Sequence, residues 1–354
     1  MLKSIRDLLL PEVEAIRLIL RGGSVVDWHR LQFTSSTEIE RFLATQELSL
    51  ENPSDRAYLD HVREAAIEYL RRNFSFSIPK PIERAPVDQL MLIASGQAES
   101  NHRQLCACTV LKTLHIIHHM SGRELLFRLP VSDHDLFHLV EEKVYRVVGT
   151  MLSAGFPITE FIGGRKNLDS TYTKLLSKRE ATASALYDKL RFRIVTRTRE
   201  DLLPVLNYLT ERVVPFNYVV PLQSSNTILD FAELCRQHPH LGQMAPHFQG
   251  DTDDMLSTGD NRFSAPSYRV IHFVADIPVR VPEHVMEQAP DGCEALGPIV
   301  FMLCEFQLLD ADSDAANETG DASHESYKQR QRAAVFRRLR MGVRPEKSPG
   351  DADS

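Results

Sequence analysis

Apolar positions change their spacing along this chain. Before about residue 150 they recur every three or four residues, the spacing of one face of a helix. Segment 55–74 shows this most clearly, and further apolar helical patterns run through 105–120 and 134–152. The first twenty residues have a weaker pattern of the same kind, which we interpret as an amphipathic helix broken at Pro11. We therefore predict a mostly helical region over residues 1–150.

The second half contains apolar runs of strand length. We predict strands at 187–198, 214–223, 268–281 and 298–309, with an amphipathic helix over 199–213 that accommodates Pro204 in its first turn. Helices and strands in this order predict an α+β fold, in which helices flank a small mixed sheet.

The same pattern predicts a domain organisation. We expect a second domain over 151–340, with an insertion at 224–262 that is rich in Gly, Pro, Asp and His and has little periodicity. The tail at 341–354 has the composition of a disordered segment.

Composition narrows the class of protein. With 354 residues, 43% hydrophobic and 25% charged, the chain resembles an ordinary soluble globular protein with room for two domains. The net charge of −7 disfavours wholesale coating of nucleic acid but leaves room for a local basic pocket. We predict neither a membrane span nor a signal peptide, and five cysteines without zinc spacing favour free thiols in a reducing cytoplasm.

Histidines cluster in the first half without a metal motif. His115, His118 and His119, with His134-Asp135 further on, resemble parts of a metal-dependent phosphohydrolase. Such a site needs a His-Asp pair, whereas His119 is followed by methionine, and His134-Asp135 follows Ser132 or Asp133, which we predict to cap a helix. We interpret these residues as ordinary helix histidines and predict no hydrolase site.

Glu305 is the most informative single position. It lies inside the apolar run 298–309, where a buried carboxylate costs several kcal/mol unless a metal or a cation meets it. His324, Tyr327 and Lys328 follow about 19 residues later, within about one helical turn. A strand carboxylate followed by a polar helix is typical of sites that hold a nucleotide and its Mg²⁺.

Two further segments carry cations. If 163–179 is a helix, Lys166, Ser170 and Lys174 lie on one stripe, which suits a polyphosphate or is simply a solvated basic face. On a strand through 187–195, Lys189, Arg191 and Arg193 share one face, Leu190, Phe192 and Ile194 share the other, and Asp188 stands at its start. We expect that cationic face to bind a charged ligand.

An aromatic group comes next in the chain. Tyr268 follows a turn and shares a strand face with His272, where it either stacks on a base or is an ordinary strand residue.

Taken together, the segments 165–174, 188–194, 266–272 and 305–328 resemble motifs of the RelA/SpoT-type alarmone synthetase family. RKNLDSTYTK is similar to its basic entry helix, DKLRFRI to its D-x-x-G-I-R-I strand and PSYRVIH to its N-G-Y-x-S-x-H turn. Glu305-Phe306-Gln307, Asn317-Glu318 and His324 to Lys328 are similar to its E-x-Q strand and the following helix. The resemblance covers roughly residues 150–330.

The resemblance implies an ATP-dependent pyrophosphokinase that transfers pyrophosphate to the 3′-hydroxyl of GDP or GTP, or of ADP or ATP. It implies that Asp188 and Glu305 are catalytic and hold Mg²⁺. The implied ATP-binding residues are Arg165, Lys166, Ser170, Lys174, Arg191 and Arg193. The implied acceptor-binding residues are Tyr268, which would stack on the base, with His272, Gln307, His324 and Lys328.

The chain departs from the family pattern mainly on the acceptor side. Arg191 replaces a glycine, Pro266-Ser267 replace Asn-Gly, and Leu309 replaces an arginine. Two alternatives therefore stay open. One is a toxin-type relative that modifies the 3′ end of tRNA, with the basic segment 328–340 contacting the phosphate backbone; the other is a degenerate synthetase that binds a nucleotide without turning it over.

Overall fold

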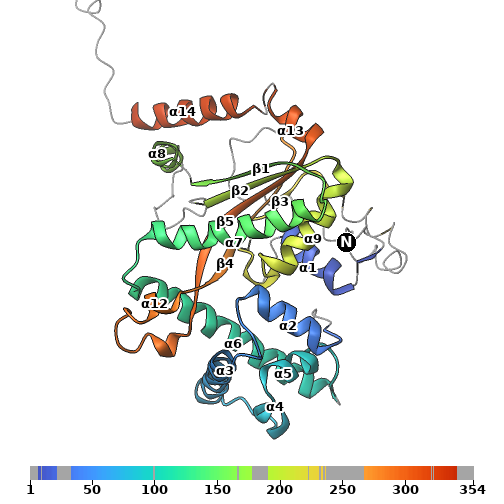
Figure 1. Cartoon of the computed structure of the whole chain (residues 1–354), viewed down its shortest axis with the longest axis vertical. Helices are drawn as coiled ribbons and strands as arrows, with labels where there is room; N and C mark the ends of the chain where they lie inside the picture. Colours follow the sequence, from blue (N-terminus) through green and yellow to red (C-terminus); the bar gives the residue numbers. More distant parts are fainter. Residues whose placement is uncertain are drawn as a thin grey trace, which may run out of the picture.

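The chain folds around a five-stranded mixed sheet with helices on both of its faces (Figure 1). The computed structural model describes residues 7–8, 10–21, 33–98, 100–165, 167–177, 190–221, 223–230, 233, 236, 267–319, 321 and 323–340. Within these ranges no helix is long and apolar enough to cross a membrane. The insertion beyond residue 236 and the tail predicted at 341–354 lie outside the described residues.

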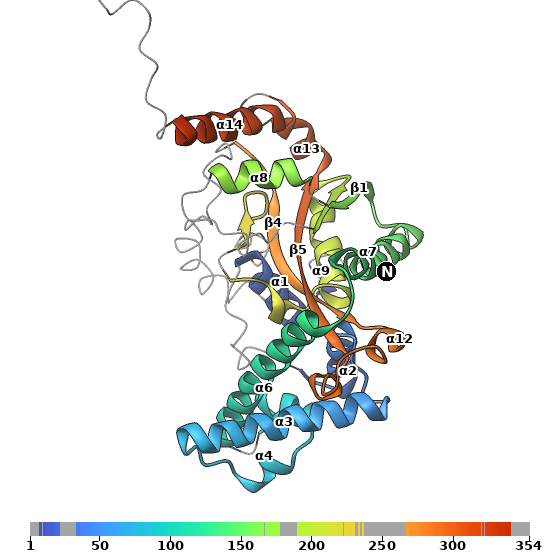
Figure 2. The same cartoon turned by 90° about the vertical axis from the view of Figure 1, so that its left-hand side faces the viewer.

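The strands are β1 (Ile158–Arg165), β2 (Leu190–Thr196), β3 (Ser225–Asn226), β4 (Ile271–Arg280) and β5 (Ile299–Asp310), and their order in the sheet is β1-β2-β5-β4-β3. The pair β2 and β5 is parallel, and the other neighbours are antiparallel. The predicted mixed sheet is thus confirmed, with β2, β5 and β4 side by side. In Figure 2, β4 and β5 run from the end of the molecule near α13 down to the helical layer.

The helices are α1 (Leu10–Arg21), α2 (Ser36–Thr45), α3 (Pro53–Phe74), α4 (Lys80–Arg84), α5 (Val87–Ala94), α6 (Asn101–Arg128), α7 (Asp133–Ser153), α8 (Leu168–Ser177), α9 (Leu202–Arg212), α12 (Glu283–Met286), α13 (Ala311–Asn317) and α14 (His324–Arg340). The helical interpretation of the first 150 residues is confirmed for the part of them that is described. α9 matches the helix expected over 199–213.

Buried side chains form two hydrophobic clusters. One joins the apolar face of the sheet, including Phe192 and Phe306, to residues of α1, α7 and α9. The other lies among α2 to α6 and includes Ile299 and Phe301 of β5. The sheet is therefore packed on both sides: α7 covers the face of Phe192 through Tyr145, and α6 covers the lower part of the opposite face.

One strand prediction was wrong, and two helices begin at other residues than expected. The strand expected at 214–223 is a 3₁₀ turn at Phe216–Tyr218 followed by one bridge from Val219 to Ala275, because the flanking Pro215 and Pro221 cannot donate to a ladder. The helix expected from residue 163 begins at Leu168, since 163–165 belong to β1. α1 begins at Leu10, so Pro11 lies in its first turn, where its missing N–H costs nothing.

Candidate functional site

Polar side chains gather on one face of the three central strands. Register pairs Arg191 of β2 with Glu305 of β5, and Gln307 with both Arg193 of β2 and His272 of β4. Since directly paired residues project to the same side of a sheet, all five side chains share one face. The alternation predicted for β2 is confirmed, because Leu190, Phe192 and Ile194 are fully buried on the other face.

Glu305 is buried and held by its neighbours on this face. Gln307 donates a hydrogen bond from Nε2 to Glu305 Oε1 at 2.7 Å, and His272 Nε2 lies 3.1 Å from the same oxygen. Two polar partners offset part of the cost of burying the carboxylate. The unfavourable position seen in the sequence is thus a structured polar cluster formed by two adjacent strands.

Tyr268 lies just before β4 and is positioned by two separate contacts. Thr227 donates from Oγ1 to the Tyr268 carbonyl at 3.0 Å, and Asn317 of α13 bonds both the N–H and the carbonyl of Arg269, at 2.9 and 2.7 Å. Burial is the main cause that raises the pKa of Tyr268, and the charges of Arg193, Glu305 and Arg191 also act on it. The phenol therefore lies within electrostatic reach of the residues on the polar face.

The two arginines of β2 have different surroundings. Arg193 forms an ion pair with Asp314 of α13, and its Nε is buried without a hydrogen-bond partner among the described residues. Arg191 is exposed, and within the described part of the chain it makes neither an ion pair nor a side-chain hydrogen bond. On this face the guanidinium of Arg193 is therefore held by Asp314, whereas that of Arg191 is available to a ligand.

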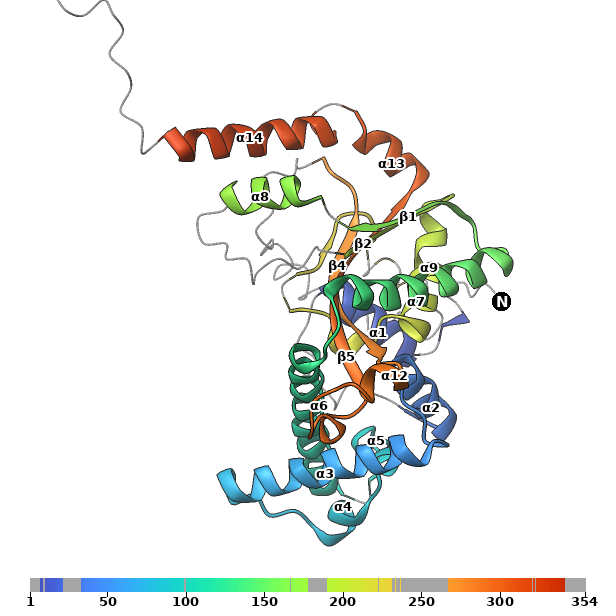
Figure 3. The same ribbon diagram turned by 60° about the vertical axis from the view of Figure 1, so that its left-hand side comes forward.

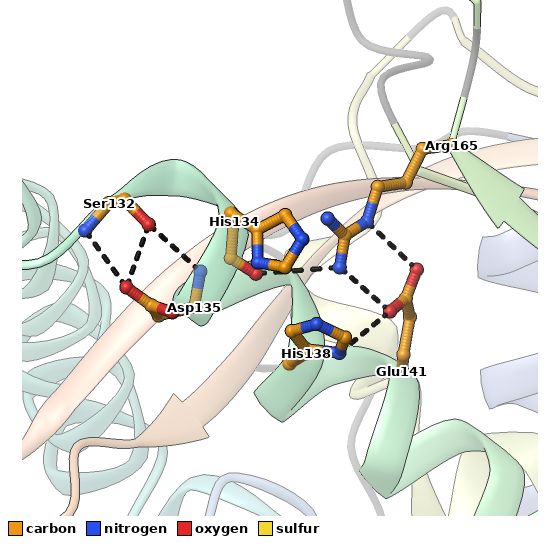
Figure 4. Close-up of polar contacts among 6 residues, drawn as sticks. All are labelled: Ser132, His134, Asp135, His138, Glu141 and Arg165. Carbon is orange, nitrogen blue, oxygen red and sulfur yellow. Dashed lines mark hydrogen bonds and ion pairs between the residues drawn. The ribbon is translucent and has the colours of Figure 1, made fainter.

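Arg165 lies away from this cluster. It is paired with Leu190, so its side chain is on the α7 face of the sheet, where Nε and Nη2 bond the two carboxylate oxygens of Glu141 at 3.1 and 3.0 Å (Figure 4). His138 Nδ1 lies 3.4 Å from the same carboxylate. The structure thus does not bring Arg165 together with Glu305, because as the last residue of β1 it points to the opposite face.

The remaining predicted residues are placed only in part. Asp188 and Lys166 lie outside the described residues, as do the side chains of Lys174 and His324. Ser170 on α8 and Lys328 on α14 are half-buried. These two helices lie side by side, joined by a hydrogen bond from Arg338 Nη1 to the Leu176 carbonyl at 3.0 Å (Figures 1 and 3).

The histidines of α6 form a polar seam between the helical layer and the sheet. The residues of this seam are His115, His118, His119, Tyr58, Tyr218 and Asp276. His118 Nδ1 bonds the Tyr58 hydroxyl at 2.8 Å, and His119 Nε2 bonds Asp276 of β4 at 2.8 Å. Burial lowers the pKa of His115 and of His118 to about 3. No three His, Cys, Asp or Glu residues in the described ranges are arranged to hold a metal.

Sequence reasoning missed Asp314, which pairs with Arg193, and named Asn317 only within the Asn317-Glu318 motif, without its role of holding the segment before β4. Both lie on α13, a short helix capped by Asp310, whose side chain accepts from the Ser313 N–H at 2.9 Å. The cap was visible in the run Asp310-Ala-Asp-Ser313, a common signal for a helix start. Which side chains that helix then meets depends on packing.

Comparison with known proteins gives one kind of match. No family model matches the chain, and no curated protein does. Among solved structures, small alarmone synthetase 1 from Bacillus subtilis is 16% identical, with 57% of this chain and 84% of that chain covered at a TM-score of 0.29. Small alarmone synthetase 2 from the same organism is 14% identical, with 62% of this chain and 94% of that chain covered at a TM-score of 0.29.

A GTP pyrophosphokinase family protein from Streptococcus pneumoniae is 13% identical, with 58% of this chain and 84% of that chain covered at a TM-score of 0.30. These neighbours are the kind of enzyme whose motifs the sequence resembles. At TM-scores of this size the overlap is partial, and the roles of individual residues rest on the contacts described above.

Proposed function

We propose that this chain is a nucleotide pyrophosphokinase, which transfers pyrophosphate from ATP to the 3′-hydroxyl of a guanosine or adenosine nucleotide. The observation that carries the proposal is the polar face itself: a buried Glu305 held by His272 and Gln307, beside Arg191, Arg193 and Tyr268. Such a face offers a carboxylate, cations and an aromatic ring within one small area.

Pyrophosphoryl transfer asks little covalent chemistry of the protein. In the proposed reaction the acceptor 3′-oxygen attacks the β-phosphorus of ATP, a new O–P bond forms, and the bond from that phosphorus to the α–β bridging oxygen breaks to release AMP. Glu305 is the group that takes the hydroxyl proton or orients the hydroxyl. The guanidinium groups stabilise the charge of the phosphates, and Tyr268 stacks on the acceptor base.

Asp188 and Glu305 are the residues that would hold Mg²⁺, which takes oxygen ligands and when bound neutralises phosphate charge. Glu305 supplies a buried carboxylate for such an ion, and Asp188 comes in the sequence two residues before β2, the strand that pairs with β5. Ser170, Lys174, His324 and Lys328 belong to the same proposal through α8 and α14. Arg165 is left out, because Glu141 already binds its guanidinium.

The test is an acceptor screen with purified protein and ATP labelled in its β- and γ-phosphates, in the presence of Mg²⁺. GDP, GTP, ADP and bulk tRNA are offered separately. We expect label to move onto at least one nucleotide acceptor and to be lost in Glu305→Gln. If the protein binds ATP but labels no acceptor, it is a degenerate nucleotide-binding protein, an alternative favoured by the ion pair that occupies Arg193.

A second acceptor class is favoured by the composition of α14. Among the described residues Arg332 and Arg337 form no ion pair, and Phe336 beside them is 55% exposed. Exposed arginines interleaved with an aromatic ring suit a single-stranded nucleic acid. Label on the 3′ end of tRNA, lost in the double variant Arg332→Ala with Arg337→Ala, would place the chain in this class.

A further inference from the structure

We propose that Arg191 is a specificity-determining residue: it binds a 5′-phosphate of the acceptor, so that the acceptor is a nucleoside diphosphate or triphosphate. This inference rests on the proposed function and names the substrate class of the same face. Arg191 is an exposed residue of β2 on the polar face.

The first step is position. Arg191 is directly opposite Glu305 in the parallel pair of β2 and β5, and adjacent strands are about 4.8 Å apart. Both side chains leave the sheet on the face that carries Gln307 and His272. A nucleotide with its 3′-hydroxyl at Glu305 therefore has Arg191 as an immediate neighbour.

The second step is availability. The other arginines of the sheet are engaged: Arg193 with Asp314, and Arg165 with Glu141. Arg280 of β4 is likewise bound to Asp55, at 2.6 Å. Of the four, Arg191 alone forms no side-chain hydrogen bond or ion pair within the described ranges, and its side chain is exposed. Its five N–H donors are thus open to a ligand.

The third step is chemistry. A guanidinium presents its donors in a planar fork that matches two oxygens of a phosphate, and it stays charged at every physiological pH. The charges of Arg191 and Glu305 both act on the Tyr268 phenol, so Tyr268, whose ring packs in part against the hydrophobic cluster, lies near the same face. Base, 3′-hydroxyl and 5′-phosphate of one nucleotide then meet Tyr268, Glu305 and Arg191 respectively.

The experiment compares each acceptor diphosphate with its nucleoside in the transfer assay: GDP with guanosine, and ADP with adenosine. For Arg191→Ala we expect KM of the diphosphate to rise by about 10- to 100-fold, the scale of one charge-assisted hydrogen bond. The KM of the nucleoside, which has no 5′-phosphate for Arg191 to bind, should change less than that of the diphosphate, and the KM of ATP shows whether the lost contact belonged to the donor. Arg191→Lys should recover part of the loss, because it keeps the charge but not the fork.

Arg197→Ala is the matched control, since Arg197 is exposed just beyond the other end of β2 and leaves the polar face intact. An unchanged KM for the diphosphate in Arg191→Ala would overturn the proposal. A rise confined to the KM of ATP would overturn the acceptor assignment and give the phosphate to the donor. If no acceptor is labelled at all, the proposed function fails. The role of Arg191 is then tested separately by calorimetry with GDP, and equal affinity of wild type and Arg191→Ala for GDP would overturn it.

Discussion

At the scale of single residues, Glu305 combines burial with two polar partners. His272 and Gln307 approach the same oxygen, Oε1, from β4 and from β5 itself. These two contacts keep the carboxylate oriented, but burying it still costs desolvation energy. A contribution to stability therefore does not explain why a carboxylate stands at this position. The arrangement is what a group that must face a reacting hydroxyl needs.

Glu305→Gln separates the two roles of this side chain. Turnover should fall by a factor on the order of 10² or more, the scale for removing a positioned acid–base group. The melting temperature should stay equal or rise, because the amide keeps the volume and an oxygen acceptor while a buried charge is removed. Transfer rate and melting curve are measured on the same samples, with exposed Glu287→Gln as the control. A variant as active as wild type would contradict the catalytic role.

At the scale of elements, the sequence predicted those whose two faces differ strongly. β2 has buried apolar residues at 190, 192 and 194 and polar ones between them, so its faces were readable without a structure. The helix α3 likewise shows its buried stripe in the sequence. β1 was missed because it is an edge strand with two glycines and an exposed Ile162, which gives no alternation.

The contacts of the site were less readable than its strands. Arg193 and Asp314 are 121 residues apart in the sequence, and His119 and Asp276 are 157 apart. Such pairs form because the helices pack on the sheet in a particular way, and no local sequence pattern predicts that packing. The position of Arg165 was also not readable from the sequence, because it follows from the register in which Arg165 of β1 pairs with Leu190.

Two helix glycines provide a matched pair of predictions at this scale. At Gly122 of α6 a Cβ would come within 2.5 Å of the Phe301 ring and 2.6 Å of the Ile299 carbonyl oxygen. Gly122→Ala should therefore destabilise the protein by about 1–3 kcal/mol, the usual cost of overpacking. At Gly149 of α7 a Cβ meets nothing within 4 Å, so Gly149→Ala should stabilise it by about 0.5–1 kcal/mol.

Urea unfolding of the two glycine variants and wild type gives both values from one set of curves. The signs of the two changes are the critical result. A Gly122→Ala protein as stable as wild type would mean that α6 does not pack on β5 as closely as described.

At the scale of the whole molecule, the polar seam connects the helical layer to the strands of the candidate site. Its histidines come from α6, Tyr58 from α3 and Asp276 from β4. Asp276 shares its strand with His272, four residues away, on the same face. The helical layer is thus joined to the strand that carries one partner of Glu305.

The same seam makes stability depend on pH. In the folded chain burial lowers the pKa of His115 and His118 to about 3, whereas in the unfolded chain a histidine titrates near 6.5. Below about pH 6.5 the unfolded state therefore binds more protons, and the free energy of unfolding falls as the pH drops toward 3. Between these two pKa values, each histidine lowers the free energy of unfolding by about 1.4 kcal/mol for every unit by which the pH falls.

The measurement is urea unfolding of wild type and His118→Gln at intervals from pH 6.5 to pH 4. The variant loses a titrating group but keeps a polar partner for the Tyr58 hydroxyl. Its free energy of unfolding at pH 6.5 should be lower than that of wild type. Toward pH 4 it should fall less steeply, with a slope smaller than the wild-type slope by about 1.4 kcal/mol per pH unit. His61→Gln is the control, because His61 is an exposed residue of α3 and its removal should leave the slope as in wild type. Parallel slopes in wild type and His118→Gln would mean that His118 is protonated in the folded protein, and the seam would then be a charged contact between helices and sheet.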